Sequence, residues 1–425
     1  MRGLKIYGVG LFCLWAALGS QKTLLAQNIN PAQAVLDERK RRDMKRELQP
    51  ILMSSTAPTR EQQNKLGAYY VRCIFDAMVH PSALQSPETL PALREELLSD
   101  VRRANNNALH TFLIQRVAYP FAGKIWQGNY PTACKYSALL ILGELNQTEL
   151  QRTPQQKPPI PLPNARRVLL SQLKKKPDAL HIAALIGLKR HAELLAAAQQ
   201  TDNAMGAPLL NILKMDPATA DMSADGVHWM KKLAVETLGA MKVGGVAKYI
   251  VPVMADTSNP AYVRCAAADA LANLNSPALD ANEVAVTLKL LGELSVEVCM
   301  TEIDRQNSLA ESSGGFEADM RRARPAPRSP EEGGTFVEPE VPAHPLVDQA
   351  RRRLKSQLGC INAAMKVLKP IADPDANLRN THGAIDVKLN DVLKFLDDNP
   401  SALTPKDLVD QLTEKKSALQ AAIPG

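Results

Sequence analysis

The sequence predicts an all-α chain in which helical hairpins stack into an alpha-alpha superhelix. Three observations favour this fold class. Apolar residues make up 45% of the 425 residues but aromatic residues only 4%, so Ala, Leu, Val and Ile carry the apolar content. One helical pattern recurs four times, and turn residues separate its copies from second amphipathic helices. A unit recurring every 33 to 52 residues is typical of a solenoid.

The first 26 residues have the layout of a secretory signal peptide. Arg2 and Lys5 precede an apolar run from Ile6 to Leu18, and small and polar residues lead to Ala26, where cleavage is expected. The run has about 13 residues, fewer than the roughly 20 that a bilayer span needs, although an uncleaved N-terminal anchor stays open. We therefore expect an exported protein of a bacterial periplasm or cell envelope, with no integral membrane insertion after cleavage.

Residues 27–104 are predicted to form an N-terminal helical cap. The first part, Pro31–Glu47, reads as a polar and strongly basic helix. This helix would either contact an anionic surface, such as a lipid or a cell-wall polymer, or be a solvated helix balanced in part by its own carboxylates. Amphipathic patterns over residues 60–80 and 88–126 predict further helices that cap the open end of the stack.

The repeat pattern, assigned to residues 105–304, is clearest in NPAYVRCAAADALANL at residues 259–274. Asn259 and Pro260 suit a helix start, and an apolar stripe follows in steps of four, three and four. The four stripes are Val263, Ala267, Ala270, Leu274; Cys134, Ala138, Ile141, Leu145; Met230, Ala234, Thr237, Met241; and the weakest, Leu180, Ala184, Gly187, Leu188, His191. Small residues on these faces let neighbouring backbones approach, so each copy can bury the apolar face of the next.

This segment resembles the first helix of a HEAT repeat. The family's succession of Val-Arg, paired alanines, Ala-Leu, a small residue and a final Leu matches Val263, Arg264, Ala266, Ala267, Ala270, Leu271, Ala272 and Leu274. KYSALLILGEL (135–145) and KKLAVETLGAM (231–241) repeat it, with Gly143 and Gly239 at the small position. No Asp precedes Arg264 at the family's usual spacing. The resemblance implies a scaffold that holds other proteins, and a few HEAT-like families that attach bilin pigments supply an enzymatic alternative.

Second helices are predicted between the copies, at residues 164–175, 206–214, 245–255 and 282–304, and they would line a concave surface. Residues 151–164 (QRTPQQKPPIPLPN) carry five prolines and are predicted to be an extended polyproline-like insertion. The insertion is either a ligand for an aromatic groove or simply a loop. MKVGGV, at residues 241–246, is expected to be a turn between helices and not a phosphate-binding loop.

The stretch 305–345 is polar and rich in Gly and Pro, without apolar periodicity, and is predicted to be a disordered linker. After it, residues 346–425 hold three amphipathic helices, at 346–369, 381–398 and 404–422. We expect a small C-terminal helical module tethered by the linker, with a coiled-coil dimer as the alternative.

The sequence offers no pattern that carries chemistry. Beyond the signal peptide it has five scattered cysteines, a poor disulfide framework that still leaves one disulfide open, and seven histidines without metal-ligand spacing. Nucleophile, phosphate-loop and dinucleotide motifs are missing, and the basic clusters 174–176 and 351–353 lack the interleaved aromatics of nucleic-acid grooves. We therefore predict no catalytic, cofactor-binding or metal-binding residue, no cofactor and no nucleic-acid partner.

The expected function is that of a non-catalytic exported scaffold that binds other proteins through its solenoid surface. Two alternatives stay open: a cell-envelope structural protein with weak contact to an anionic polymer or membrane surface, and a subunit of an enzyme complex. The net charge of +7 over the whole chain is mild and demands no polyanionic partner.

Overall fold

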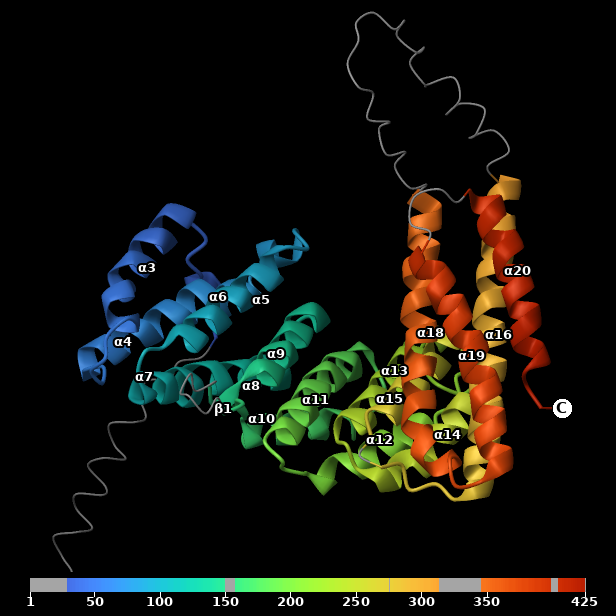
Figure 1. Cartoon of the computed structure of the whole chain (residues 1–425). Helices are drawn as coiled ribbons and strands as arrows, with labels where there is room; N and C mark the ends of the chain where they lie inside the picture. The colour runs from blue at the N-terminus through green and yellow to red at the C-terminus, as the bar shows by residue number, and fades with distance from the viewer. Residues whose placement is uncertain (1–28, 150–156, 275, 313–344, 399–403, 425) are drawn as a thin grey trace, which may run out of the picture. The chain divides into compact units, whose positions relative to one another are not determined.

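The computed structural model describes residues 29–149, 157–274, 276–312, 345–398 and 404–424 (Figure 1). It confirms the predicted all-α class, because the described residues contain only two short strands besides helices. The chain divides into two compact units, Met1–Thr237 and Leu238–Gly425, and the division falls within one helix. The predicted signal peptide and most of the predicted linker lie outside the described residues.

Unit 1 is built from α-helices with a few 3-10 and π segments. In chain order these are η1 (Pro31–Gln33), α3 (Glu38–Leu52), α4 (Arg60–Tyr69), η2 (Tyr70–Phe75), α5 (Asp76–Val79), η3 (Pro81–Leu84), α6 (Thr89–Arg103), α7 (Asn107–Phe112), η4 (Leu113–Ala118), α8 (Tyr119–Gln127), α9 (Thr132–Glu144), β1 (Asn146–Thr148), β2 (Ile160–Pro161), α10 (Pro163–Gln172), α11 (Ala179–Ala197), η5 (Asn203–Met205) and α12 (Gly206–Leu213). α13 (Ala224–Ala240) spans the division between the units.

Unit 2 continues with η6 (Gly244–Val246), α14 (Ala247–Ala255), α15 (Ala261–Ala272), α16 (Ala281–Ser312), α18 (Pro345–Ala372), α19 (Ala376–Asp398) and α20 (Pro405–Ala421). The predicted glycine turn at 241–246 is confirmed, since Lys242 adopts a φ of 55° and η6 follows it. The helix predicted at Pro31 instead begins at Glu38, where the Asp37 side chain accepts a hydrogen bond from the Lys40 amide.

The four template copies are all helices, α9, α11, α13 and α15, and one pair of them in each unit makes the same close contact. A Cβ placed on Gly143 would lie 2.6 Å from the Gly187 Cα, and one placed on Gly239 would lie 2.6 Å from the Ala270 Cα. When the copies are aligned, both contacts join the same two template positions of successive first helices. The small residues therefore allow close backbone approach at equivalent places, which is compatible with the predicted solenoid.

Residues 38–127 contain a further repetition that the sequence did not reveal. The π segments Tyr70–Phe75 and Leu113–Ala118 have six residues each, at an offset of 43, and each interrupts a longer helical run. α3 and α6, of 15 residues each, precede these two runs. The offset also relates three pairs of buried residues: Leu66 and Leu109, Val71 and Ile114, Ile74 and Val117. Residues 38–127 thus form two similar hairpins, and the second crosses the predicted boundary between cap and solenoid at residue 104.

The proline-rich insertion is only partly described. β2 pairs antiparallel with β1, and the Leu162 amide donates to the Leu145 carbonyl at 2.9 Å. Leu162 is buried. Residues 160–162 are therefore held by the chain itself, which contradicts a polyproline ligand at this point, while residues 150–156 lie outside the described residues.

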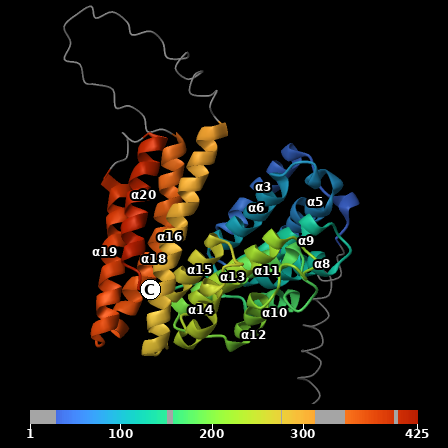
Figure 2. The same cartoon turned by 90° about the vertical axis from the view of Figure 1, so that its right-hand side faces the viewer.

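The C-terminal helices do not form a separate tethered module. α18 packs on both α15 and α16, α20 packs on α16, and α19 joins α18 to α20. Figures 1 and 2 show α16, α18, α19 and α20 side by side as a four-helix bundle. α16 runs to Ser312, so the predicted linker boundary at 305 is wrong. The helix α16 was predicted to belong to the last repeat. In the structure, α16 also forms one wall of the bundle.

Candidate functional site

An open cavity of about 490 Å³ lies between α3, the end of α4 and α6 in unit 1. A cluster of charged side chains and one tyrosine, together with Ala92 and Ser99, lines it: Glu38, Arg41, Arg42, Lys45, Tyr69, Glu95 and Glu96. The basic helix predicted from the sequence contributes four of these residues. The cavity is the place where the predicted contact with an anionic ligand can be examined.

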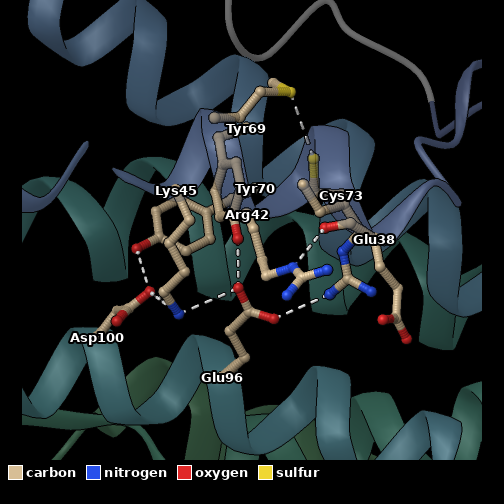
Figure 3. A network of polar contacts seen from close by, with 10 residues as sticks. Glu38, Arg42, Lys45, Tyr69, Tyr70, Cys73, Glu96 and Asp100 are labelled. Carbon is tan, nitrogen blue, oxygen red and sulfur yellow. Dashed lines mark hydrogen bonds and ion pairs between the residues drawn. The ribbon is translucent and has the colours of Figure 1, made fainter. Parts of the chain in front are cut away.

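Glu96 is the centre of a polar network in this cavity (Figure 3). Its carboxylate accepts hydrogen bonds from Arg41 at 2.9 Å, from Lys45 at 3.1 Å and from the Tyr69 hydroxyl. Lys45 also lies 3.3 Å from Asp100, which accepts a hydrogen bond from the Tyr70 hydroxyl at 3.0 Å. The Glu96 side chain is 19% exposed and that of Asp100 only 4%, so the pairs are shielded from water.

The local fold explains why these groups converge. Glu96 and Asp100 are one turn apart on α6, so they share a face that is turned toward α3. Arg41 and Lys45 have the same spacing on α3. Tyr69 and Tyr70 stand where α4 passes into the π segment η2, and their rings meet edge to face with centroids 5.3 Å apart. The sequence could not pair these residues because they come from three separate helices.

The protonation states of Tyr69 and Glu96 do not suit these two groups to proton transfer. Burial and the Glu96 carboxylate raise the pKa of Tyr69 well above its ordinary value, so the phenol keeps its proton. Burial alone would raise the pKa of Glu96, but the hydrogen bond from Tyr69 and the cations Lys45 and Arg41 lower it below its ordinary value. A general base has to hold a proton with a pKa near the working pH. Glu96 is instead a stabilised carboxylate that holds the helices together.

The outward charge of α3 is balanced. Between residues 37 and 47 the chain has six cations and four carboxylates, and the network takes up two of the cations, Arg41 and Lys45. Four cations remain, Arg39, Lys40, Arg42 and Arg46, beside the four carboxylates Asp37, Glu38, Asp43 and Glu47. An exposed face without net charge attracts a polyanion weakly. This balance favours the solvated-helix interpretation.

A second open cavity, of about 440 Å³, lies beside η1 and is lined by Gln33, Ala34, Val35, Leu36, Asp37, Lys40 and Arg72. The Val35 amide donates to the Arg72 carbonyl at 3.1 Å and so ties this loop to η2. Nearby, the Asn30 amide donates to the buried Asp76 carboxylate at 2.7 Å. Burial raises the pKa of Asp76 to about 6, against the lowering effects of the Asn30 amide and Arg72.

The histidines are mostly structural. His382 bonds the Met365 carbonyl at 2.9 Å, His181 bonds Asp178 at 3.0 Å, and His110 lies 3.4 Å from Glu149. His191 is fully buried, and neither of its ring nitrogens makes a well-formed hydrogen bond. Burial, reinforced by the nearby charges of Arg190 and Arg166, lowers the pKa of His191 to about 3, so it stays neutral. His344 lies outside the described residues.

The basic clusters are used within the fold. Arg351 donates to the Leu396 carbonyl, Arg353 binds Glu302 through two nitrogens at 2.7 and 3.0 Å, and Arg352 pairs with Asp348. Arg351 and Arg353 thus stabilise the bundle. Lys175 stacks on Trp126, with 4.2 Å between the amine and the ring centroid, and Lys176 pairs with Asp221.

Comparison with models of protein families, with curated proteins and with solved structures gives no match. The resemblance to HEAT repeats therefore stays a prediction from the sequence. Within the described ranges, no group of three or more His, Cys, Asp or Glu side chains could hold a metal ion. In the same ranges, no helix has both the length and the apolar character that crossing a bilayer requires.

Proposed function

We propose that this chain is a non-catalytic, exported scaffold that binds another protein through its repeat helices. The observation that carries the proposal is how the polar groups of the described cavity are used. Arg41, Lys45 and Tyr69 all bind the Glu96 carboxylate, whose pKa is lowered below its ordinary value, and the raised pKa of Tyr69 keeps its phenol protonated. Because the charged residues of this cavity stabilise the packing of the helices, we infer that the fold serves as a surface for binding another protein.

Two exposed apolar residues support a protein partner, and both lie on first helices of the repeat, whereas the second helices were expected to line the binding surface. Ile186 on α11 is 40% exposed and Trp229 on α13 is 49% exposed. Their helices are linked by the ion pair between Lys189 and Glu236 at 2.9 Å, and Lys232 lies 5.2 Å from the centroid of the Trp229 ring. Tryptophan and nearby charged side chains often supply the binding energy of protein interfaces.

The test is affinity purification of the full chain from the envelope of its source cell, followed by cross-linking and mass spectrometry. A defined protein should co-purify at fixed stoichiometry and cross-link to α11 or α13. Trp229→Ala should reduce its recovery about tenfold or more. Val387→Ala is the matched control, since Val387 is 55% exposed on α19 and should have no effect.

Two other outcomes would contradict the scaffold. Salt-sensitive pelleting with envelope material, without a defined protein, would favour the anionic-polymer alternative. Turnover by the purified chain on a panel of substrates would favour an enzyme or an enzyme subunit.

A further inference from the structure

Unit 2 contains two cysteines on helices that pack directly against each other. Cys265 lies on α15 and Cys360 on α18, and these two helices pack extensively against each other. Cys265 is only 3% exposed, whereas Cys360 is half-buried. Both sulfurs are thiols in the structure.

Burial and helical register favour a position of both thiols between the two helices. The apolar stripe of α15 contains Val263, Ala267 and Ala270, and Cys265 points to the opposite side with Ala268, which is also fully buried. On α18, Cys360 is one turn from the fully buried Ala364. Small residues on both helices let the backbones approach closely, which a disulfide requires. A charge on Cys360 contributes to the raised pKa of Cys265, which supports a short separation of the two side chains.

We propose that Cys265 and Cys360 form a disulfide that fastens α18 to α15. A small-molecule or protein disulfide, RSSR, is the oxidant. The accessible Cys360 thiolate attacks one sulfur of RSSR, which forms a mixed disulfide and releases RS⁻. The Cys265 thiolate then attacks the Cys360 sulfur, forms the Cys265–Cys360 bond and releases the second RS⁻. The oxidant gains two electrons, and the two thiol protons end on two RSH.

The reactivities of the thiols suit this order. Burial raises the pKa of Cys265 to about 12, so this thiol reacts slowly with an external oxidant. Attack on the adjacent mixed disulfide is intramolecular, and this compensates for the low thiolate fraction. Cys299, on α16 of unit 2, is fully buried with a pKa that burial raises to about 12, so it provides a matched buried thiol.

The experiment uses the full chain, purified reduced and then incubated with oxidised glutathione. Mapping of non-reduced peptides should find a Cys265–Cys360 cross-link and both thiols protected from alkylation. The bond closes a loop of about 95 residues, so oxidation should raise the Tm of the unit 2 transition by on the order of 10 °C. C360S and C265A should abolish this rise, and C299A should keep it.

Three results would overturn the proposal: a stable glutathione adduct on Cys360, dimers linked through Cys360, or both thiols still open to alkylation after oxidation. The cross-link is read from peptides, so it is judged independently of whether any partner binds. If C265A fails to fold, C360S still decides the matter, since Cys360 is half-buried and serine is a conservative change there.

Discussion

At the scale of single residues, two buried groups without full hydrogen bonding make stability depend on pH in opposite directions. His191 has a pKa far below its ordinary value, and Asp76 has one above its ordinary value. The Asp76 Oδ2 and both nitrogens of His191 lack hydrogen-bond partners of good geometry. Neither group would be conspicuous in the sequence, because burial and not residue type causes the shifts.

His191 should make unit 1 sensitive to acid. Its folded pKa of about 3 lies below the ordinary 6.5, so from pH 6.5 downward the unfolded chain binds a proton that the folded chain refuses. The loss of stability, complete near pH 3, would be on the order of 4–5 kcal/mol. His191→Leu should remove it. Denaturant unfolding at pH 7 and pH 4 measures the effect, and an unchanged difference between the two pH values would show that His191 is not the cause.

Asp76 should make the free energy of unfolding change with pH in the opposite direction. Its folded pKa of about 6 lies above the ordinary 3.8, so stability falls as pH rises from 3.8 through 6. The expected loss is roughly 2–3 kcal/mol at pH 7. Asp76→Asn keeps an acceptor for the Asn30 amide. This variant should remove most of the change in stability between pH 4 and pH 6. Chemical denaturation across that range is the measurement, with Glu95→Gln, a change of an exposed carboxylate, as control.

At the scale of elements, the repeat helices were predictable and their exact contacts were not. Local spacing alone predicted the buried face formed by Val263, Ala267, Ala270 and Leu274. All four residues are buried. The pairing of Gly143 with Gly187 depends on how two helices cross, which no local pattern specifies. The network at Glu96 was missed for the same reason, since its partner Arg41 lies 55 residues away.

The crossing of α9 and α11 can be tested with two helical glycines. Gly143→Ala would place a Cβ 2.6 Å from the Gly187 Cα, and backbone cannot yield easily, so we expect a loss of about 2–3 kcal/mol. Gly123→Ala in α8 has no atom within 4 Å of the new Cβ and should be neutral or stabilising by up to about 1 kcal/mol. Equal melting temperatures for the two variants would argue against close packing at Gly143.

Ala267→Glu should unfold unit 2. Ala267 is fully buried on the inner stripe of α15, and a carboxylate there would have to enter an apolar contact without a partner. The expected cost exceeds about 4 kcal/mol. Ala281→Glu is the control, because Ala281 is exposed in the first turn of α16, where a negative charge is favourable. Thermal unfolding followed by circular dichroism compares the two variants. A cooperative transition of Ala267→Glu at the Tm of the unsubstituted chain would refute the packing of Ala267 against a neighbouring helix.

At the scale of the whole molecule, the sequence misplaced the end of α16 and the independence of the C-terminal helices. The helix continues past residue 304 on polar residues, and apolar periodicity gave no signal for them. Glu302, just before this point, and Gln306, just after it, are buried, and Glu302 binds both Gln306 and the distant Arg353. A long-range ion pair thus replaces the apolar contact that sequence patterns detect.

A chain that ends at Ser312 should therefore lose more than its last helices. Removal of α18 to α20 exposes the apolar faces of α15 and α16, so unit 2 should become sensitive to protease and prone to aggregate. Residues 345–425, supplied as a separate chain, should restore protection. Limited proteolysis followed by mass spectrometry is the measurement. A truncated chain with native protection in α15 and α16 would restore the model of an independent C-terminal module.

The length of α16 has a mechanical consequence. Its 32 residues form a continuous rod of about 48 Å that belongs both to the last hairpin and to the bundle. A partner that exerts a force on the bundle would also exert it on the hairpin of α15 and α16. The reason is that a continuous helix resists bending more than a flexible loop does. A force on the bundle would thus be transmitted through α16 to α15. No hinge between the bundle and the hairpin of α15 and α16 would absorb it.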